Sequence, residues 1–220
     1  MGMNGCYGKN MRNIYFQLKG IGLFVFIPII GLYLLIPTVN YIVFWFYHDW
    51  DLLYDSILKE CQYFIPLLSV WWSFFLLEHY VEEPGHELLY IDRRNKWFTL
   101  FLLYIGYLIL MLPLFFVYTG LFPELWWLFL KLGIINLLYL AIAYATAFLT
   151  GKIVISVLGL LLYSIYVIAE ESNFLGISYY NSLILTNGEF LHEMQGFVIA
   201  TIIFFIAGVI GNHMFPERNR

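Results

Sequence analysis

The sequence has little charge. Asp, Glu, Lys and Arg make up only 12% of its 220 residues, against about 25% in a typical soluble domain. The net charge is −4, and no run of Lys or Arg resembles a polyanion-binding patch. We therefore expect no nucleic-acid partner. A water-soluble fold is also excluded, because 62% hydrophobic residues would need a larger core than a chain of this length can enclose.

Cysteines are few, and a nucleotide-binding glycine motif is missing. The two cysteines, Cys6 and Cys61, fall on opposite membrane faces in the topology predicted below, so we expect no disulfide. Residues 150–153 read Thr-Gly-Lys-Ile and lack the upstream glycine and the hydroxyl residue of a phosphate-binding loop. We therefore expect no nucleotide, metal or other cofactor bound by this chain itself.

Long apolar runs dominate the sequence instead. A bilayer core of about 30 Å takes about 20 helical residues, and six runs come close to this length: 21–47, 57–77, 97–118, 125–149, 153–169 and 196–214. They predict an all-α polytopic membrane protein. Its six-helix transmembrane domain spans 21–214, between an N-terminal segment 1–20 and a tail 215–220. We expect membrane lipids to surround the outward faces of these helices.

The basic residues predict the orientation of the chain. With the N-terminus inside, only Lys59 and Lys131 lie near the outer ends of spans, and Lys131 either is functional or extends outward to the interface. All the other bases fall on the cytoplasmic side, as the positive-inside bias requires. The sequence therefore predicts a plasma-membrane protein with both termini in the cytoplasm. The bases on that side are Lys9, Arg12, Lys19, Arg93, Arg94, Lys96, Lys152, Arg218 and Arg220.

Two segments outside the predicted spans carry more apolar residues than a solvated connection needs. In 1–20, Met11, Ile14, Tyr15 and Leu18 share one helical face, which predicts an interfacial helix on the inner leaflet; a frayed basic tail is the alternative. The outer segment 170–195 is rich in Phe, Tyr, Leu and Ile. Short re-entrant helices that dip into the outer leaflet would explain it.

The largest cytoplasmic segment, 78–96, is predicted to hold a short amphipathic helix. Acids near Pro84 suit a helix start and the bases after Ile91 suit its end, while the leucines give it an apolar side. Docking onto another protein would use such a side; lying against the inner membrane surface is the alternative. The candidate contact residues are Glu82, Glu83, Gly85, Glu87, Leu88, Leu89 and Arg93.

Small residues recur in the fourth run. Ala143, Ala147 and Gly151 are spaced by four, and Ala141 with Ala145 forms a second row. Rows of this kind let helix backbones approach closely. The first row is a candidate seam, either between two copies of the chain or within one helical bundle.

These features together resemble the ABC-2 type permeases, the membrane subunits of a class of ABC exporters. That family has an N-terminal elbow helix, six spans, a coupling helix between spans two and three, and re-entrant helices between spans five and six. The resemblance covers nearly the whole chain. The family places two residues between the glycine and the acid, where this chain has only His86. The family also has a proline before its basic residues, and this chain has Asp92 in that region instead. The local signature reads Glu82-Glu83-Pro84-Gly85-His86-Glu87-Leu88-Leu89, followed by Arg93, Arg94 and Lys96.

The resemblance implies a division of labour. ATP and magnesium would bind a separate ATPase subunit, whose motion reaches this chain through the coupling helix. Two ATPase chains and a second permease, identical or paralogous, would complete the exporter. In size and aromatic content the chain resembles permeases for phenol-soluble modulins or lantibiotics, which implies an amphipathic peptide as cargo. The chain itself would then have no catalytic residues.

An intramembrane metalloprotease of the CAAX-processing and bacteriocin-immunity type is the alternative. Such proteins use a Glu-Glu pair with a following Arg and histidines on later spans, and this chain offers Glu170, Glu171, His192 and His213. No Arg follows the pair before Arg218. In the predicted topology the glutamates and His213 lie at opposite membrane faces, so they are not expected to bind one metal.

Overall fold

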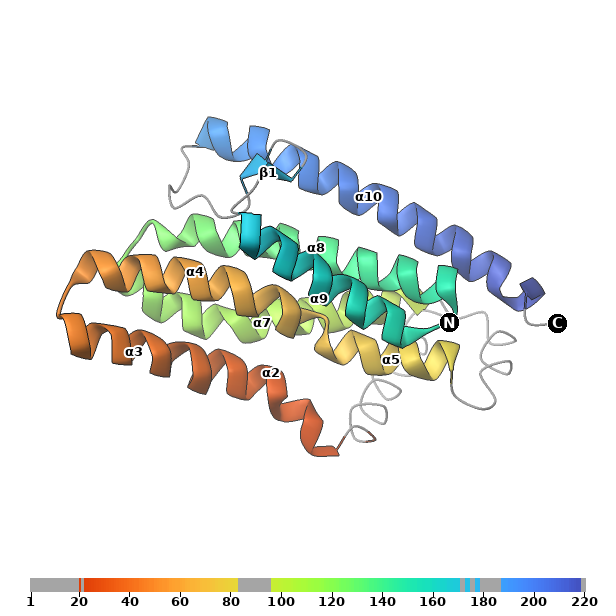
Figure 1. The fold of residues 1–220 in the computed structure, drawn as a ribbon, viewed down its shortest axis with the longest axis horizontal. Coiled ribbons are helices and arrows are strands. Elements are labelled where there is room, and N and C mark those ends of the chain that lie inside the picture. Colours follow the sequence, from red (N-terminus) through yellow and green to blue (C-terminus); the bar gives the residue numbers. More distant parts are fainter. Residues whose placement is uncertain are drawn as a thin grey trace, which may run out of the picture.

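The described part of the chain is a bundle of long helices. The computed structural model describes the backbone of residues 20, 22–82, 96–170, 173–174, 177–178 and 187–218, and the side chains of 20, 22–82, 96–166 and 194–214. Within these residues five helices are long and apolar enough to cross a membrane, and a shorter apolar helix covers Ile153–Tyr166. This is the architecture of a helical membrane protein (Figure 1). The five are Gly22–Tyr47, Trp50–Val81, Lys96–Leu121, Leu125–Thr150 and Met194–Met214.

The first of these helices is irregular in its first half. A 3-10 turn η1 (Gly22–Phe26) leads into α2 (Ile27–Ile30), a π-helical turn η2 (Gly31–Leu35) and α3 (Ile36–Tyr47). Proline lies near the start of α2 and of α3, where it cannot donate a backbone hydrogen bond. Irregular backbone at membrane depth needs other partners. Trp71 and Trp72 supply them, because their indole N–H groups donate to the carbonyls of Phe24 and Val25, each at 3.0 Å.

The second helix begins earlier than its apolar run suggested. Residues 50–56, expected in a loop, form the start of α4 (Trp50–Ser69), which continues after Val70 as α5 (Trp71–Val81). The Asp49 side chain caps α4 by accepting a 2.9 Å hydrogen bond from Asp51 N. A charged start is common in helices because acids complement the positive end of the helix dipole. The acids therefore belong to the helix rather than to a loop.

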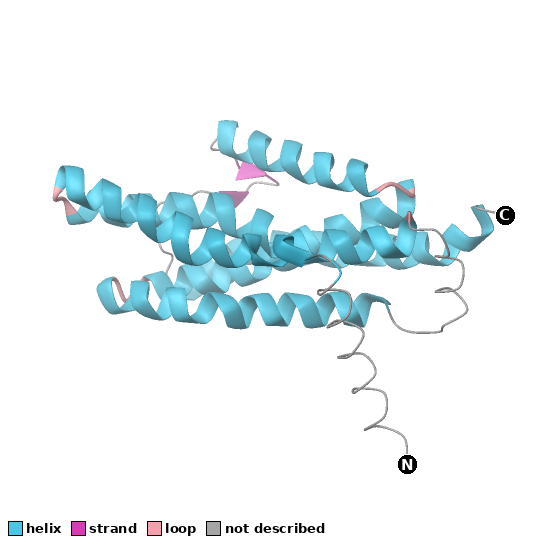
Figure 2. Ribbon diagram, turned by 90° about the horizontal axis from the view of Figure 1, so that it is seen from below, coloured by secondary structure: helices cyan, strands magenta, loops and turns pink. Residues whose placement is uncertain are grey.

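The remaining elements alternate in direction along the bundle. They are α7 (Lys96–Leu121), α8 (Leu125–Thr150), α9 (Ile153–Glu170), the paired strands β1 (Asn173–Phe174) and β2 (Ile177–Ser178), and α10 (Asn187–Arg218). In the outer segment 170–195, the described residues are the last residue of α9, a two-stranded hairpin and the first turns of α10. The other residues of the segment, on which the expected re-entrant helices also fall, lie outside the described part of the chain. Figure 2 shows that helices make up almost all of the described structure.

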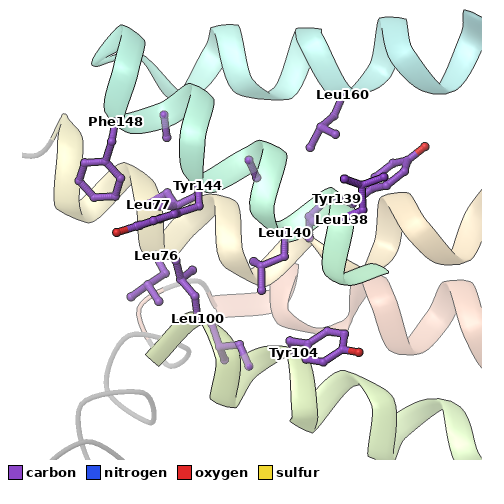
Figure 3. Packing of buried hydrophobic residues seen from close by; sticks show 14 of the residues in the cluster. Leu76, Leu77, Leu100, Tyr104, Leu138, Tyr139, Leu140, Tyr144, Phe148 and Leu160 are labelled. Carbon is purple, nitrogen blue, oxygen red and sulfur yellow. The ribbon is translucent and has the colours of Figure 1, made fainter. Parts of the chain in front are cut away.

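The core is organised around α8. Two thirds of its most apolar stretch is buried, against about a fifth in the first helix. One cluster of buried side chains joins α8 to α3, α4 and α7 near Trp50, and includes Ile57, Tyr107 and Phe115. The other joins α8 to α5, α7, α9 and α10 and includes Leu77 and Tyr144 (Figure 3). We call the two ends of the bundle the Trp50 end and the Glu82 end.

Candidate functional site

Most of the predicted coupling residues lie outside the described part of the chain. This holds for Glu83, Gly85, Glu87, Leu88, Leu89 and Arg93, and for the N-terminal segment 1–19. Glu82, the last described residue before the gap, and Lys96, the first after it, are both placed. They belong to the ends of α5 and α7, so they fix where the segment 83–95 leaves and re-enters the bundle.

Glu82 is bound to the start of α9. Its Oε1 accepts a 2.8 Å hydrogen bond from the backbone N of Ile153, the first residue of that helix. The first N–H groups of a helix have no partner within it, and a carboxylate also complements the positive end of the helix dipole. A side chain 71 positions earlier in the sequence therefore acts as the cap of α9.

Lys96 is bound to the end of α10. Its ammonium donates a 3.2 Å hydrogen bond to Oδ1 of Asn212 and lies over the rings of Tyr80 and Phe148, at 5.5 and 5.3 Å from their centroids. Cation–π contacts of this kind are attractive where water is scarce. The buried lysine thus joins α5, α7, α8 and α10 at the Glu82 end.

The predicted small-residue row lies inside this single chain. Ala143 and Ala147 are fully buried, and Gly151 ends α8 with φ of 71°, a left-handed conformation that glycine adopts without strain. The carbonyl of Ala143 accepts a 3.0 Å hydrogen bond from Ser156 of α9, whose hydroxyl also lies 2.7 Å from that of Thr146. This side of α8 therefore packs against α9.

The helices α8 and α10 approach each other closely at two glycines of α10. A Cβ added to Gly208 would overlap the ring of Tyr144 and lie 3.1 Å from the backbone N of Ala145, and one on Gly211 would lie 3.3 Å from the backbone N of Leu149. The second small-residue row of α8, which contains Ala145, thus meets Gly208 of α10. The glycine pair on α10 was not singled out from the sequence, although its i, i+3 spacing places both glycines near one helical face.

A narrow groove opens between α7, α8 and α10 in the half of the bundle nearer the Glu82 end. Its volume is about 290 Å³ and its lining is almost wholly apolar. Polar side-chain groups in the lining belong only to Trp97, Tyr144 and Thr201, and the Thr201 hydroxyl donates a 2.7 Å hydrogen bond to the carbonyl of Phe197 within its own helix. The rings of Trp97 and Phe205 meet edge to face with their centroids 6.0 Å apart. The lining residues are Trp97, Leu100, Phe101, Leu137, Leu140, Ala141, Tyr144, Thr201, Ile202 and Phe205.

Polar side chains are also buried within the membrane-spanning helices. Asn40 donates a 2.9 Å hydrogen bond to the Tyr118 hydroxyl, and Asn136 makes a longer 3.4 Å contact with the sulfur of Met111. The side-chain carbonyl oxygens of Asn40, Gln62 and Asn136 have no hydrogen-bond partner among the described residues. Sequence inspection missed all three because an isolated amide barely alters an apolar run. Lys131 was noticed, and it is buried rather than extended to the surface.

The described residues do not assemble a metal site. Where side chains are described, no group of three or more His, Cys, Asp or Glu could hold an ion. Of the residues considered for a metalloprotease, Glu170 ends α9 at the far end of that helix from Glu82, while His213 lies in the last turns of α10, close in sequence to Asn212 at the Glu82 end. Their helices therefore carry them to opposite ends of the bundle (Figure 1).

Compared with known proteins, the chain matches no protein-family model, no curated protein and no solved structure.

Proposed function

We propose that this chain is the permease subunit of an ATP-driven ABC exporter of the ABC-2 type. In this proposal the chain forms the membrane path, and a separate ATPase subunit binds ATP and magnesium on the cytoplasmic side. The segment 78–96 is the coupling element that docks onto the ATPase. A second permease, identical or paralogous, completes the transporter, and an amphipathic peptide is its cargo.

The proposal counts six membrane spans. The helix α9 (Ile153–Glu170) has 18 residues, which at about 1.5 Å per residue gives about 27 Å, close to the bilayer core of about 30 Å. With α9 as the fifth span, both termini and most bases fall at the Glu82 end. The positive-inside bias then makes this end cytoplasmic, and the plasma membrane is the proposed location.

One observation carries the proposal more than any other. The two residues that border the segment 83–95 are each bound to a different helix: Glu82 to the start of α9 and Lys96 to the end of α10. These two helices are also the ones that the outer segment connects. A force applied to the segment would therefore reach α9 and α10 directly, through two partly buried hydrogen bonds, as an ATP-driven subunit requires.

Co-purification with the ATPase tests the proposal. The tagged permease is solubilised from its native membranes in mild detergent and recovered through the tag, and a co-purified phosphate-loop ATPase is identified by mass spectrometry. Charge reversal by Glu87→Lys is expected to reduce recovery of the ATPase, because the acid would otherwise bind a basic cleft. The matched control, Asp51→Lys, reverses an exposed acid at the Trp50 end and is expected to leave recovery unchanged.

The recovery of the ATPase with the two variants distinguishes the possible outcomes. Loss of the ATPase in Glu87→Lys alone, with the same chromatographic profile of the permease, supports docking through 78–96. Equal recovery in both variants contradicts that assignment. Accessibility labelling of a cysteine placed at position 87 provides an independent check, because labelling from outside intact cells would contradict the cytoplasmic location of the segment.

A further inference from the structure

We propose that the groove between α7, α8 and α10 binds one acyl chain of a membrane lipid, drawn from the leaflet at the Glu82 end. The inference does not depend on the proposed transport function. It rests on where the groove lies, how large it is and which chemical groups line it.

The position of the groove limits its occupant to something dissolved in the membrane. All three of its walls belong to candidate membrane-spanning helices. The outward faces of α7 and α10 are apolar and exposed, as at Ile109 and Ile206. In a bilayer the medium against such faces is hydrocarbon. An open apolar groove there meets lipid chains rather than water.

The depth of the groove corresponds to a single leaflet. On α7 the lining begins at Trp97, next to the first residue of the helix, and on α8 it extends from Tyr144 back to Leu137. The seven steps between these two residues cover about 10 Å at 1.5 Å per residue, and half of a bilayer core is about 15 Å. The groove therefore opens to one leaflet, and the indole of Trp97 lies toward its headgroup side, as interfacial tryptophans do.

The size of the groove favours a single chain over a helix. One turn of an α-helix with its side chains occupies about 400–600 Å³, from a diameter of 10–12 Å and a pitch of 5.4 Å. The groove, at about 290 Å³, is smaller than one such turn, which favours a single hydrocarbon chain as its occupant. A methylene group occupies about the same volume as a water molecule in the liquid, about 30 Å³. The groove therefore holds about ten methylene groups.

The chemistry of the lining agrees with a hydrocarbon chain. Thr201 is the one hydroxyl residue in the lining apart from Tyr144, and its hydroxyl is engaged with Phe197. Leu100, Ala141 and Tyr144 form a floor that is at most 3% exposed. A ligand that needed hydrogen bonds would lose them here, whereas a hydrocarbon chain gains close packing against leucine and aromatic side chains.

Photolabelling in a defined bilayer tests the inference. The full-length protein is reconstituted into nanodiscs of phosphatidylcholine and phosphatidylglycerol that contain phosphatidylcholine with a diazirine in the middle of one acyl chain. After irradiation, labelled positions are mapped by mass spectrometry. We expect the floor residues to be labelled more than Phe116, which is 81% exposed on another part of α7. Ordinary surrounding lipid would label Phe116 most, and that result would overturn the inference.

Variants that fill the groove provide the second readout. Ala141→Phe places a ring on the floor and is expected to lower labelling of Leu100 about tenfold, the change that corresponds to 1.4 kcal/mol of lost contact. Ile202→Trp at the exposed mouth keeps the test open if Ala141→Phe does not fold. Ile109→Trp, on a lipid-facing position outside the groove, is the matched control and should leave labelling of Leu100 unchanged. Unchanged labelling in a folded Ala141→Phe or Ile202→Trp protein would contradict the site.

Cysteine cross-linking distinguishes lipid from the other possible occupant of the groove, a second copy of the chain. In a protein with Cys6→Ser and Cys61→Ala, Ile202→Cys is placed at the mouth of the groove. If lipid fills the groove, oxidation in native membranes leaves the protein monomeric on a non-reducing gel. Efficient cross-linking between two copies through position 202 would show that protein covers the groove and would overturn the inference.

Discussion

The Oε1 of Glu82 lies 2.8 Å from the backbone N of Ile153, so α9 is capped by a side chain from the end of α5. The turn between α8 and α9 consists of only Gly151 and Lys152. The cap therefore holds the α8–α9 hairpin against α5 at the place where the chain leaves for the segment 83–95. Movement of that segment and the position of α9 are linked by one hydrogen bond.

Removal of this cap should lower stability. Glu82→Ala deletes the acceptor, and loss of a helix cap costs about 1 kcal/mol, so the thermal midpoint in detergent is expected to fall by a few degrees. Glu82→Gln keeps an acceptor oxygen and should retain part of the effect. Glu78→Ala, an exposed acid one turn earlier, is the control. Equal midpoints for Glu82→Ala and Glu78→Ala would mean that the cap is unimportant.

The contact between α8 and α10 should tolerate no side chain at Gly208. Gly208→Leu would push the Tyr144 ring and the backbone at Ala145 away from α10. Overpacking of this kind costs about 1–3 kcal/mol. We expect lower thermal stability and a lower yield of monodisperse protein. Gly106→Leu is the matched control, because nothing lies within 4 Å of a Cβ at Gly106. A loss as large in the control would show that the close approach is not the cause.

The positions of the long helices could be predicted from the sequence, because twenty apolar residues in a row depend on no tertiary contact. The start of α4 was missed for the converse reason: Asp51 and Asp55 interrupt the apolar pattern although Asp49 caps a helix there. Which helices are neighbours was not predictable from periodicity. The bond from Glu82 to Ile153, the groove and the partner of Ala145 all depend on that arrangement.

Replacement of the buried amides Asn40 and Asn136 should change thermal stability in opposite directions. Asn40→Leu removes the hydrogen bond to the Tyr118 hydroxyl and leaves that buried hydroxyl without its donor, at a cost of about 1–3 kcal/mol. Asn136→Leu removes a side chain whose oxygen has no partner among the described residues and whose nitrogen contacts only a weak acceptor, the sulfur of Met111. We expect the thermal midpoint to fall in the first variant and to rise in the second. A comparable fall in both would contradict this assignment.

The tryptophan contacts should hold the start of the first membrane helix in place. Trp72→Phe keeps an aromatic ring near Tyr107 but removes the donor to the carbonyl of Val25, which leaves irregular backbone without that partner. Amide hydrogen exchange in η1, measured by mass spectrometry in detergent, is expected to become faster. Trp45→Phe changes a lipid-facing indole and should leave this exchange unaltered. Identical exchange in the two variants would exclude the stabilising role of Trp72.

The π-helical turn η2 accommodates one extra residue in the first helix. Pro28, Leu32, Ile36 and Asn40 are all buried, at a constant spacing of four. In an uninterrupted α-helix this spacing drifts by about 40° per step, about 120° over the three steps, and Asn40 would turn away from Tyr118. The extra residue in the wide turn compensates for about 100° of that drift. A related chain one residue shorter between 31 and 35 could therefore form a regular α-helix there and keep its amide on the same face, because eleven regular positions also leave a drift of only about 20°.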